Sequence, residues 1–194
     1  VRPTHKNIMK PGFGVGGYCL TKDPLFARLS AKQFYDIDLD FPLSTKSVQI
    51  NREMPLATLT YLLDYFDQDL AGKTVLLMGV SYRQDVGDTR YSPSETFVNK
   101  ARKLGAEVQC HDPLVDEWEE LDESVLQEIP DPSGFDAIVF AVPHEEYKQI
   151  DFKEWLHNDK IVVLDACNVL SRDNRSAFHQ EGIRHFTIGR GVGL

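Results

Sequence analysis

The feature that most constrains the fold is a regular alternation of short apolar runs and longer amphipathic stretches from residue 73 onward. Five runs are predicted to be strands, at 74–80, 107–112, 136–142, 160–166 and 184–189. The segments predicted to be helices are 93–104, 116–128, 145–157 and 171–181. Strands that are apolar along their whole length are typical of a parallel sheet that helices cover on both faces. We therefore predict an α/β fold, a Rossmann-like doubly wound parallel sheet of about five strands.

Residues 24–70, which precede this region, have helical character. After Pro42, Ser44 can cap a helix, and apolar side chains then recur at spacings of three and four residues. These side chains are Met54, Ala57, Tyr61, Leu62, Tyr65 and Phe66. Pro55 is expected to kink this helix or to mark a restart. The apolar stripe either packs against its own domain or forms a subunit interface.

Whole-chain composition disfavours several classes of function. The 194 residues carry a formal net charge of −9 with a pI near 5.1, which disfavours nucleic-acid and anionic-membrane partners. No apolar run approaches the ~20 residues of a membrane span. Three cysteines, an odd number, indicate a reducing cytosolic setting without a disulfide framework. The six histidines lack the spacing of metal ligands, so no metal site is predicted.

The stretch "PGFGVGGYCLTKDP" at 11–24 contains four glycines within six residues and then a cysteine. Gly12, Gly14 and Gly17 match the G-x-G-x-x-G spacing of a dinucleotide-binding turn. That turn requires a buried strand directly before it, and the polar, proline-bracketed lead-in does not read as one, so we interpret the match as accidental. The glycines instead leave the backbone open to a bulky polar ligand, with the Cys19 thiol two residues beyond the last of them.

A second chemistry-bearing segment, "SYRQDVGDTRYSPSE", follows the first predicted strand. In doubly wound sheets ligands bind beyond the carboxyl ends of the strands, so this loop lies at the expected ligand edge. Its Arg83 and Arg90 guanidiniums are suited to phosphate oxygens, whereas the alternative pairs them with the neighbouring Asp85 and Asp88. The loop ends in a helix start with an N-cap, a first-position proline and a capping-box acid at Ser92, Pro93 and Glu95.

These motifs resemble the C-terminal part of the UDP-glucose/GDP-mannose dehydrogenase family, the nucleotide-sugar 6-dehydrogenases. The resemblance rests on "PGFGVGGYCLTKDP", "GVSYRQDVGDTRYSPS", "HDP" and "IGRG" in that order, and it covers nearly the whole chain. It implies a catalytic-cysteine loop and a central helical dimerisation segment in residues 1–70, followed by a UDP-sugar-binding Rossmann-like domain in 71–194. The N-terminal NAD-binding domain of the family is expected to be absent from this chain.

The resemblance also implies an activity and partners. The intact enzyme would be a cytoplasmic, NAD-dependent homodimer, paired through the central helix, that oxidises the C6 alcohol of a UDP-sugar to a uronic acid. Motif details favour a UDP-N-acetylhexosamine (mannosamine or glucosamine) as substrate, with UDP-glucose as the alternative. Two other classes stay open: a non-catalytic nucleotide-sugar-binding and dimerisation module, and a redox sensor built on Cys19.

Residue roles follow from the same resemblance. Cys19 is implied as the nucleophile that forms a thiohemiacetal and then a thioester, and Asp23 as the group that positions the water or the base. Substrate contacts are implied for Lys10, Phe13, Gly14, Gly16, Tyr82 and Arg83. Cofactor contacts are implied for Lys22 and Arg90.

One position departs from the family pattern. Where the family often has a basic residue near the fourth strand, this sequence reads Asp165-Ala166-Cys167-Asn168. A cysteine does not hold a phosphate as arginine does, so that contact is not expected here. We interpret both Cys167 and Cys110 as core-packing residues.

Overall fold

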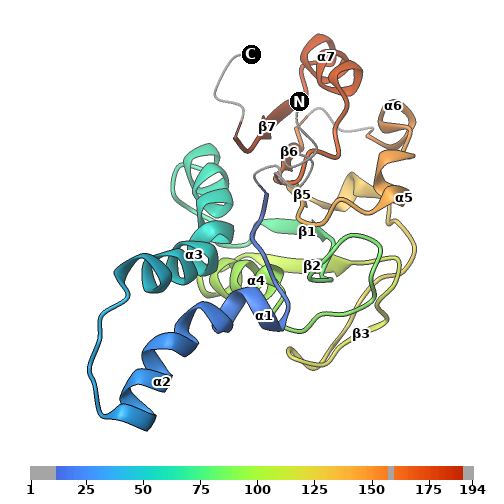
Figure 1. The fold of residues 1–194 in the computed structure, drawn as a ribbon. Helices are drawn as coiled ribbons and strands as arrows, with labels where there is room; N and C mark the ends of the chain where they lie inside the picture. Colours follow the sequence, from blue (N-terminus) through green and yellow to red (C-terminus); the bar gives the residue numbers. More distant parts are fainter. Residues whose placement is uncertain (1–11, 157–159, 190–194) are drawn as a thin grey trace, which may run out of the picture.

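A computed structural model describes residues 12–156 and 160–189 of the chain (Figure 1). Five strands form one sheet: β1 (Thr74–Met78), β2 (Glu107–His111), β5 (Ala137–Phe140), β6 (Val162–Asp165) and β7 (Arg184–Thr187). Their order across the sheet is β2-β1-β5-β6-β7, and every neighbouring pair is parallel. The predicted α/β fold is confirmed, and each of the five predicted strands is present.

Helices cover both faces of the sheet. The main helices are α3 (Pro42–Tyr65), α4 (Pro93–Lys103), α5 (Glu145–Lys148), α6 (Phe152–Trp155) and α7 (Arg172–Glu181). Val75 and Leu77 of β1 belong to an apolar cluster with α3 and α4, whereas Leu76 and Met78 belong to a second cluster with α5, α6 and α7. Side chains alternate between the faces of a strand, and here both faces are apolar, which explains why the strands read as continuous apolar runs.

The helix predicted at 116–128 is wrong. This segment contains a small antiparallel hairpin of β3 (Glu117–Trp118) and β4 (Glu123–Ser124). Trp118 is fully buried, and Arg102 of α4 forms an ion pair with Glu123 across a part-buried contact. Asp122, at the turn, has a positive φ of 53°, a conformation that no helix interior allows. Trp118 therefore marks an inward-facing position of this hairpin.

The predicted helix at 145–157 is two short helices, α5 and α6. The Asp151 carboxylate accepts hydrogen bonds from the amides of Lys153 and Glu154, so it caps a new helix and ends any continuation of α5. The predictions at 93–104 and 171–181 are confirmed by α4 and α7, and Ser92 caps α4 as expected, with Pro93 at the first helical position. The amide of Ser92 donates to the Thr89 carbonyl, which replaces the reciprocal half of the predicted capping box.

The N-terminal part of the chain is helical, as predicted. It contains α1 (Tyr18–Lys22), the 3-10 turn η2 (Asp23–Leu25), α2 (Phe26–Tyr35) and α3. Helix α3 begins at Pro42 after Phe41, so the predicted cap at Ser44 is wrong; proline suits the first helical position because the missing N–H has no partner there. Pro55 lies inside α3 without ending it, which excludes a restart. Across residues 12–156 and 160–189, no helix combines the length and the apolarity needed to cross a membrane.

The apolar face of α3 is displaced from the predicted stripe. The buried residues of α3 are Val48, Pro55, Thr58, Leu59 and Leu62, of which only Leu62 was predicted, and Ala57 is exposed. Tyr61 and Tyr65 are half-buried, and their rings lie 5.5 and 6.4 Å from the ring of Phe186 in β7. These members of the stripe therefore pack against the chain's own sheet.

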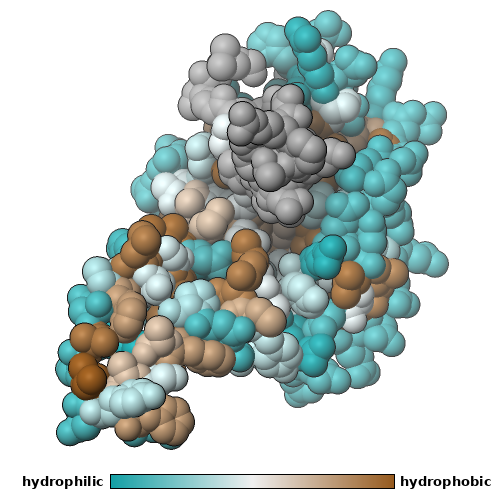
Figure 2. Space-filling model, in the orientation of Figure 1, coloured by the Kyte–Doolittle hydropathy of each residue, from teal (hydrophilic) through white to brown (hydrophobic). Residues whose placement is uncertain are grey.

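Helix α2 and its surroundings expose many apolar side chains. No residue of α2 is buried, and Figure 2 shows apolar surface concentrated over this end of the molecule, which projects from the sheet in Figure 1. The exposed residues are Phe26, Leu29, Phe34, Tyr35, Ile37, Leu39 and Leu43. Large exposed apolar surfaces are typical of interaction sites in general.

Candidate functional site

The tertiary structure brings the glycine loop onto the arginine loop. Phe13 is 3% exposed, and its ring lies 5.4 Å from that of Phe97 in α4. A Cβ atom on Gly16 would lie 2.7 Å from both Tyr82 Cβ and the Tyr91 carbonyl oxygen, so only glycine permits this close approach. The two motifs that carry the predicted chemistry, although distant in sequence, therefore form one surface at the carboxyl end of β1.

Helix α3 holds the glycine loop from its other side. The Asn51 side chain accepts a hydrogen bond from the Val15 amide at 2.8 Å and donates one to the Val15 carbonyl at 2.7 Å. A side-chain amide matches a backbone amide in this way because it offers one donor and one acceptor in a single plane. Sequence reasoning missed Asn51, since nothing in its local pattern marks it as a partner of the loop.

Replacing Asn51 by alanine is expected to loosen the glycine loop and to lower the free energy of unfolding by about 1–2 kcal/mol, the contribution of two partly exposed hydrogen bonds. Limited proteolysis within residues 12–17 and chemical denaturation measure the two effects. Gln49→Ala is the matched control, because Gln49 is exposed on the same helix and, among residues 12–156 and 160–189, its side chain bonds only to Lys46 and Glu53. Equal proteolysis rates for the two variants would contradict the assignment.

Cys19 lies in the first turn of α1 and is exposed. The amide of Asp23 donates to the Cys19 carbonyl, so the two residues are one helical turn apart, as the sequence predicted. The Asp23 carboxylate is 3.2 Å from Lys22 Nζ. The structure thus presents a thiol, a carboxylate and an ammonium group along one short helix.

The other two cysteines have different surroundings. Cys110 is buried in the sheet, and burial raises the pKa of its thiol to about 12. Cys167 is half-buried against the apolar cluster of α5, α6 and α7, its Sγ lies 3.3 Å from the Phe140 carbonyl oxygen, and burial raises its pKa well above the ordinary value. Both thiols are therefore disfavoured as thiolates, in agreement with their interpretation as packing residues.

Arg90 forms an ion pair with a neighbouring aspartate, which was the alternative to a free phosphate-binding guanidinium. Its Nη2 atom lies 2.5 Å from Asp88 Oδ2, and hydrogen bonds from Arg90 hold the pKa of Asp88 below its usual range. The guanidinium also stacks over the ring of Tyr18 at 5.0 Å, and Tyr18 makes an edge contact with Tyr91. Arg90 thus ties the arginine loop to the residue that precedes Cys19.

Arg83 behaves differently from Arg90. It is exposed, and no hydrogen bond or ion pair joins its guanidinium to any other residue in the described ranges. Asp85, its predicted alternative partner, instead accepts a hydrogen bond from the Glu145 amide at 3.0 Å. Tyr82, next to Arg83, is half-buried, and its ring lies beneath Gly17. Arg83 is therefore an exposed cation with no partner in the described part of the chain, and it follows Tyr82, which contacts the glycine loop.

Of the two predicted lysine contacts, Lys22 and Lys10, the structure describes only Lys22. Lys22 is half-exposed, pairs with Asp23, and lies over the ring of Phe26 at 4.8 Å. Lys10 lies outside the described residues.

Within the portion of the chain that the structure does describe, no group of three or more His, Cys, Asp or Glu side chains is arranged to hold a metal ion.

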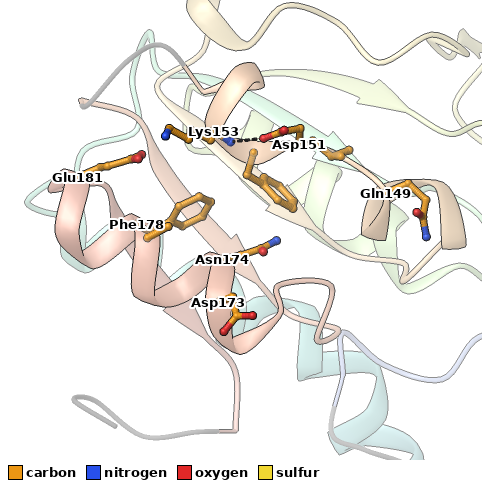
Figure 3. A pocket seen from close by; sticks show the side chains of 10 residues that line it. Gln149, Asp151, Lys153, Asp173, Asn174, Phe178 and Glu181 are labelled. Carbon is orange, nitrogen blue, oxygen red and sulfur yellow. Dashed lines mark hydrogen bonds between the residues drawn. The ribbon is translucent and has the colours of Figure 1, made fainter.

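A cavity of about 440 Å³ lies away from this surface, between α7 and the segment that joins α5 to α6. Figure 3 shows Phe178, Asn174 and Asp173 on α7 across from Asp151 and Lys153. The Asp151 carboxylate is occupied in capping α6. None of the predicted site residues lines this cavity, so the candidate site is the open surface where the glycine loop meets the arginine loop.

Fold and site together define a class of protein. Counted in chain order, the sheet has the doubly wound order 2-1-3-4-5, which places the topological switch point between β1 and β5, and the arginine loop leaves the sheet at that point. This is a Rossmann-like doubly wound domain with a thiol-bearing loop packed at the carboxyl edge of its sheet. The chain belongs to the UDP-glucose/GDP-mannose dehydrogenase family: the sequence profile of that family's UDP binding domain matches residues 76–172.

Individual relatives agree with this placement. The chain is 34% identical to a UDP-N-acetyl-D-mannosamine dehydrogenase of Methanocaldococcus jannaschii, over 95% of this chain and 41% of that protein. It is 25% identical to a UDP-glucose 6-dehydrogenase of Rickettsia bellii, over 94% of this chain and 42% of that protein. The chain thus spans about two fifths of the length of these curated relatives.

The fold is also similar to solved structures. An NDP-N-acetyl-D-galactosaminuronic acid dehydrogenase from Methanosarcina mazei Go1 superimposes with a TM-score of 0.80 at 27% identity, over 95% of this chain and 40% of that one. A UDP-D-ManNAc dehydrogenase from Pyrococcus horikoshii gives a TM-score of 0.72 at 26% identity, over 98% of this chain and 43% of that one. Both similarities extend across the helical segment as well as the sheet, since they cover nearly the whole chain.

Proposed function

We propose that this chain is the thiol-bearing and UDP-sugar-binding part of an NAD-dependent nucleotide-sugar 6-dehydrogenase. The observation that carries the proposal is the packing of the Cys19 loop onto the loop that holds Tyr82 and Arg83. A nucleotide sugar carries a diphosphate and a reactive carbon in one molecule, so a site for it requires a phosphate-binding cation and a nucleophile on one surface. The family match and the named relatives support UDP-sugars as the ligand class.

The roles divide along this surface. Arg83, whose guanidinium has no partner within the described ranges, would bind the diphosphate, with Tyr82 beside it against the nucleotide. The backbone of Gly14 and Gly16 would line the sugar, and Phe13, which is buried, would anchor that backbone from below. Lys10 stays a prediction for the same part of the ligand.

Cys19 would be the nucleophile, because it is the exposed thiol at the end of the glycine loop. Once a first hydride transfer has oxidised the C6 alcohol to an aldehyde, the Cys19 sulfur would add to C6 to give a thiohemiacetal. Loss of a second hydride would give a thioester, which water would hydrolyse to release the acid and the thiol. Asp23, one turn away, would position that water. Lys22 lies three residues after Cys19, and Arg90 stacks on Tyr18, the residue before it; these cations would leave Asp23 and Asp88 to bind the pyrophosphate of the cofactor. NAD supplies the hydride acceptor when it is bound.

The substrate we favour is a UDP-N-acetylhexosamine. The relative named for UDP-N-acetyl-D-mannosamine is 34% identical, whereas the one named for UDP-glucose is 25% identical over a similar span. UDP-glucose is the alternative. The order of affinities for the two sugars distinguishes them.

The helical segment would carry a homodimer interface. Leu43 and Ile50 on α3 are 82% and 50% exposed, next to the apolar surface of α2. The chain would also divide functionally at residue 70, into the thiol-bearing helical segment and the UDP-sugar-binding domain. Structurally, however, Phe13, Leu59 and Leu62 share one apolar cluster with the sheet. The two parts are therefore packed together and do not form separate cores.

Replacing Arg83 by alanine is expected to weaken UDP binding by about tenfold to a hundredfold, the range for losing charge-assisted hydrogen bonds to phosphate. Calorimetric titration of the chain with UDP, UDP-glucose and UDP-N-acetylmannosamine measures this effect and orders the sugars. Arg28→Ala, which removes an exposed arginine on α2, is the matched control. Equal weakening in both variants, or no binding by the unmodified chain, would contradict the proposed site.

A further inference from the structure

A buried carboxylate anchors the start of the arginine loop. Asp112 follows β2 and is fully buried. Its Oδ2 atom accepts hydrogen bonds from the amides of Val80 and Ser81, both at 2.9 Å, and from the Ser81 hydroxyl at 2.8 Å. Its Oδ1 atom accepts one from the Leu114 amide at 3.0 Å. The first residues after β1 are therefore fixed to the end of the neighbouring strand.

A buried histidine anchors the loop a second time. His144 follows β5, its side chain is 1% exposed, and its ring lies edge-on to Tyr147 at 5.3 Å. Nδ1 accepts a hydrogen bond from the Asp85 amide at 3.0 Å, and Nε2 lies 3.1 Å from Asp112 Oδ2. Because a backbone amide can only donate, Nδ1 carries a lone pair, so the Nε2 proton is donated to Asp112.

Asp85 is held by two hydrogen bonds, one from its backbone amide and one to its side-chain carboxylate. Its φ is +55°, which is uncommon for a residue with a side chain. The amide binds His144, and the carboxylate accepts the Glu145 amide at 3.0 Å, a hydrogen bond that lowers the pKa of Asp85. These paired contacts keep the chain in the left-handed conformation, which otherwise costs free energy.

Between the two anchored positions, Ser81 and Asp85, lie only Tyr82, Arg83 and Gln84. We propose that Asp112 and His144 are positioning residues that hold this arc in the geometry that binds the nucleotide diphosphate, an inference that rests on the proposed function. The Arg83 guanidinium has no partner of its own among the described residues, so its backbone anchors set where it lies. Holding the arc in place before the ligand arrives removes ordering costs from binding.

Two substitutions of His144, each of which keeps one of its two hydrogen bonds and removes the other, separate the effects of the two bonds. In His144→Asn the side-chain oxygen lies near the former Nδ1 position and can still accept from the Asp85 amide. In His144→Gln the terminal amide lies near the former Nε2 position and can still donate to Asp112, but the Asp85 amide loses its acceptor. Both variants lose one buried hydrogen bond, so a role in stability alone would affect them equally.

The test combines amide hydrogen exchange with UDP titration of the 194-residue chain. His144→Gln is expected to weaken UDP binding about tenfold and to speed exchange of the Asp85 and Tyr82 amides about tenfold, the effect of losing one buried hydrogen bond. His144→Asn should retain protection of the Asp85 amide and bind UDP within about threefold of the unmodified chain. His185→Gln, which changes a half-buried histidine on β7, controls for general loss of stability.

The outcomes separate this inference from the proposed function. Unchanged protection of the Asp85 and Tyr82 amides in His144→Gln would overturn the positioning role, as would unchanged UDP affinity in that variant. If the unmodified chain does not bind UDP, the proposed function fails. The exchange experiment still decides whether His144 holds the arc.

Discussion

Replacing Asp112 by alanine is expected to lower the free energy of unfolding by about 3–5 kcal/mol, because the change leaves a group of buried donors without an acceptor. These donors are the amides of Val80, Ser81 and Leu114, the Ser81 hydroxyl and His144 Nε2. Water has little access to replace the carboxylate, since Asp112, Val80, Ser81 and His144 are each fully buried. Chemical denaturation at neutral pH measures the loss.

Asp136→Ala is the matched control for this prediction. Asp136 also accepts from a strand amide, that of Thr74, but its side chain is 36% exposed, so water can solvate the donors that it leaves behind. We expect a loss of about 1–2 kcal/mol for Asp136→Ala. Comparable losses in the two variants would show that Asp112 is not the principal anchor of the arginine loop.

The effect of Asp112 should also depend on pH in a defined direction. Burial alone would raise the pKa of the Asp112 carboxyl, but hydrogen bonds from His144, Ser81 and Leu114 outweigh burial and lower the pKa below its ordinary value of 3.8. A carboxyl whose pKa is lower in the folded state stabilises the fold fully above its ordinary pKa and loses that contribution as the pH falls through the lowered value. The stability difference between the unmodified chain and Asp112→Asn should therefore shrink below about pH 4.

The quantity to measure is the difference in the free energy of unfolding between the unmodified chain and Asp112→Asn. The unmodified chain alone is not sufficient, because another buried carboxyl changes the stability with pH in the opposite direction. Burial raises the pKa of Asp165, although the amides of Leu170, Val169 and Cys167 donate to it. Asp165 therefore favours the fold more as the pH falls, which opposes the contribution of Asp112. A difference between the unmodified chain and Asp112→Asn that grows on acidification would contradict the assignment.

Replacing Gly16 by alanine is expected to displace the glycine loop and to lower the free energy of unfolding by about 3 kcal/mol, the upper end for an overpacked site. The added methyl group would meet Tyr82 Cβ, the Tyr91 carbonyl oxygen and Pro93 Cδ at 2.7 to 3.0 Å. None of these atoms is the far end of a flexible side chain, so the loop must move instead. Thermal unfolding and the rate of proteolysis within residues 12–17 report the change.

Gly12→Ala is the matched control within the same loop. A Cβ atom on Gly12 would have the Ala166 carbonyl oxygen as its nearest neighbour at 3.7 Å, which is an ordinary van der Waals contact. We expect no increase in proteolysis for Gly12→Ala and a stability close to that of the unmodified chain. If the two alanine variants behave alike, the close packing of Gly16 on the arginine loop is not what holds the Cys19 loop.

The parts of the fold that could be predicted from sequence are those with a local physical cause. Strands β1, β5 and β6 are apolar on both faces because helices cover both faces, and their sequences show this directly. The start of α4 was predictable because Ser92 and Pro93 satisfy the requirements of a helix N-terminus within two residues. Such signals depend on neighbours along the chain and need no knowledge of tertiary contacts.

The errors occurred where a distant partner decides the structure. The segment predicted as a helix at 116–128 is a hairpin, partly because Arg102 on α4 pairs with Glu123 and because Trp118 packs into the core of the sheet. The buried face of α3 was misplaced because the helix packs mainly against α4, with Leu59 and Leu62 toward the core. Periodicity shows that an apolar face exists, but the shape of the opposing surface selects which residues form it.

The sequence by itself determined the fold class, the five strands, the helical N-terminal segment and the chemical groups available to a site, because each of these depends on local periodicity, capping or residue type. Only the tertiary structure decided how those groups are arranged. It pairs Arg90 with Asp88, leaves Arg83 without a partner among the residues that the structure describes, and joins Asp112 to His144. The physical reason is that Asp112 and His144 follow two different strands, whose distance depends on the order of the whole sheet, and the pairing of Arg90 with Asp88 depends on the conformation of the loop that those strands hold.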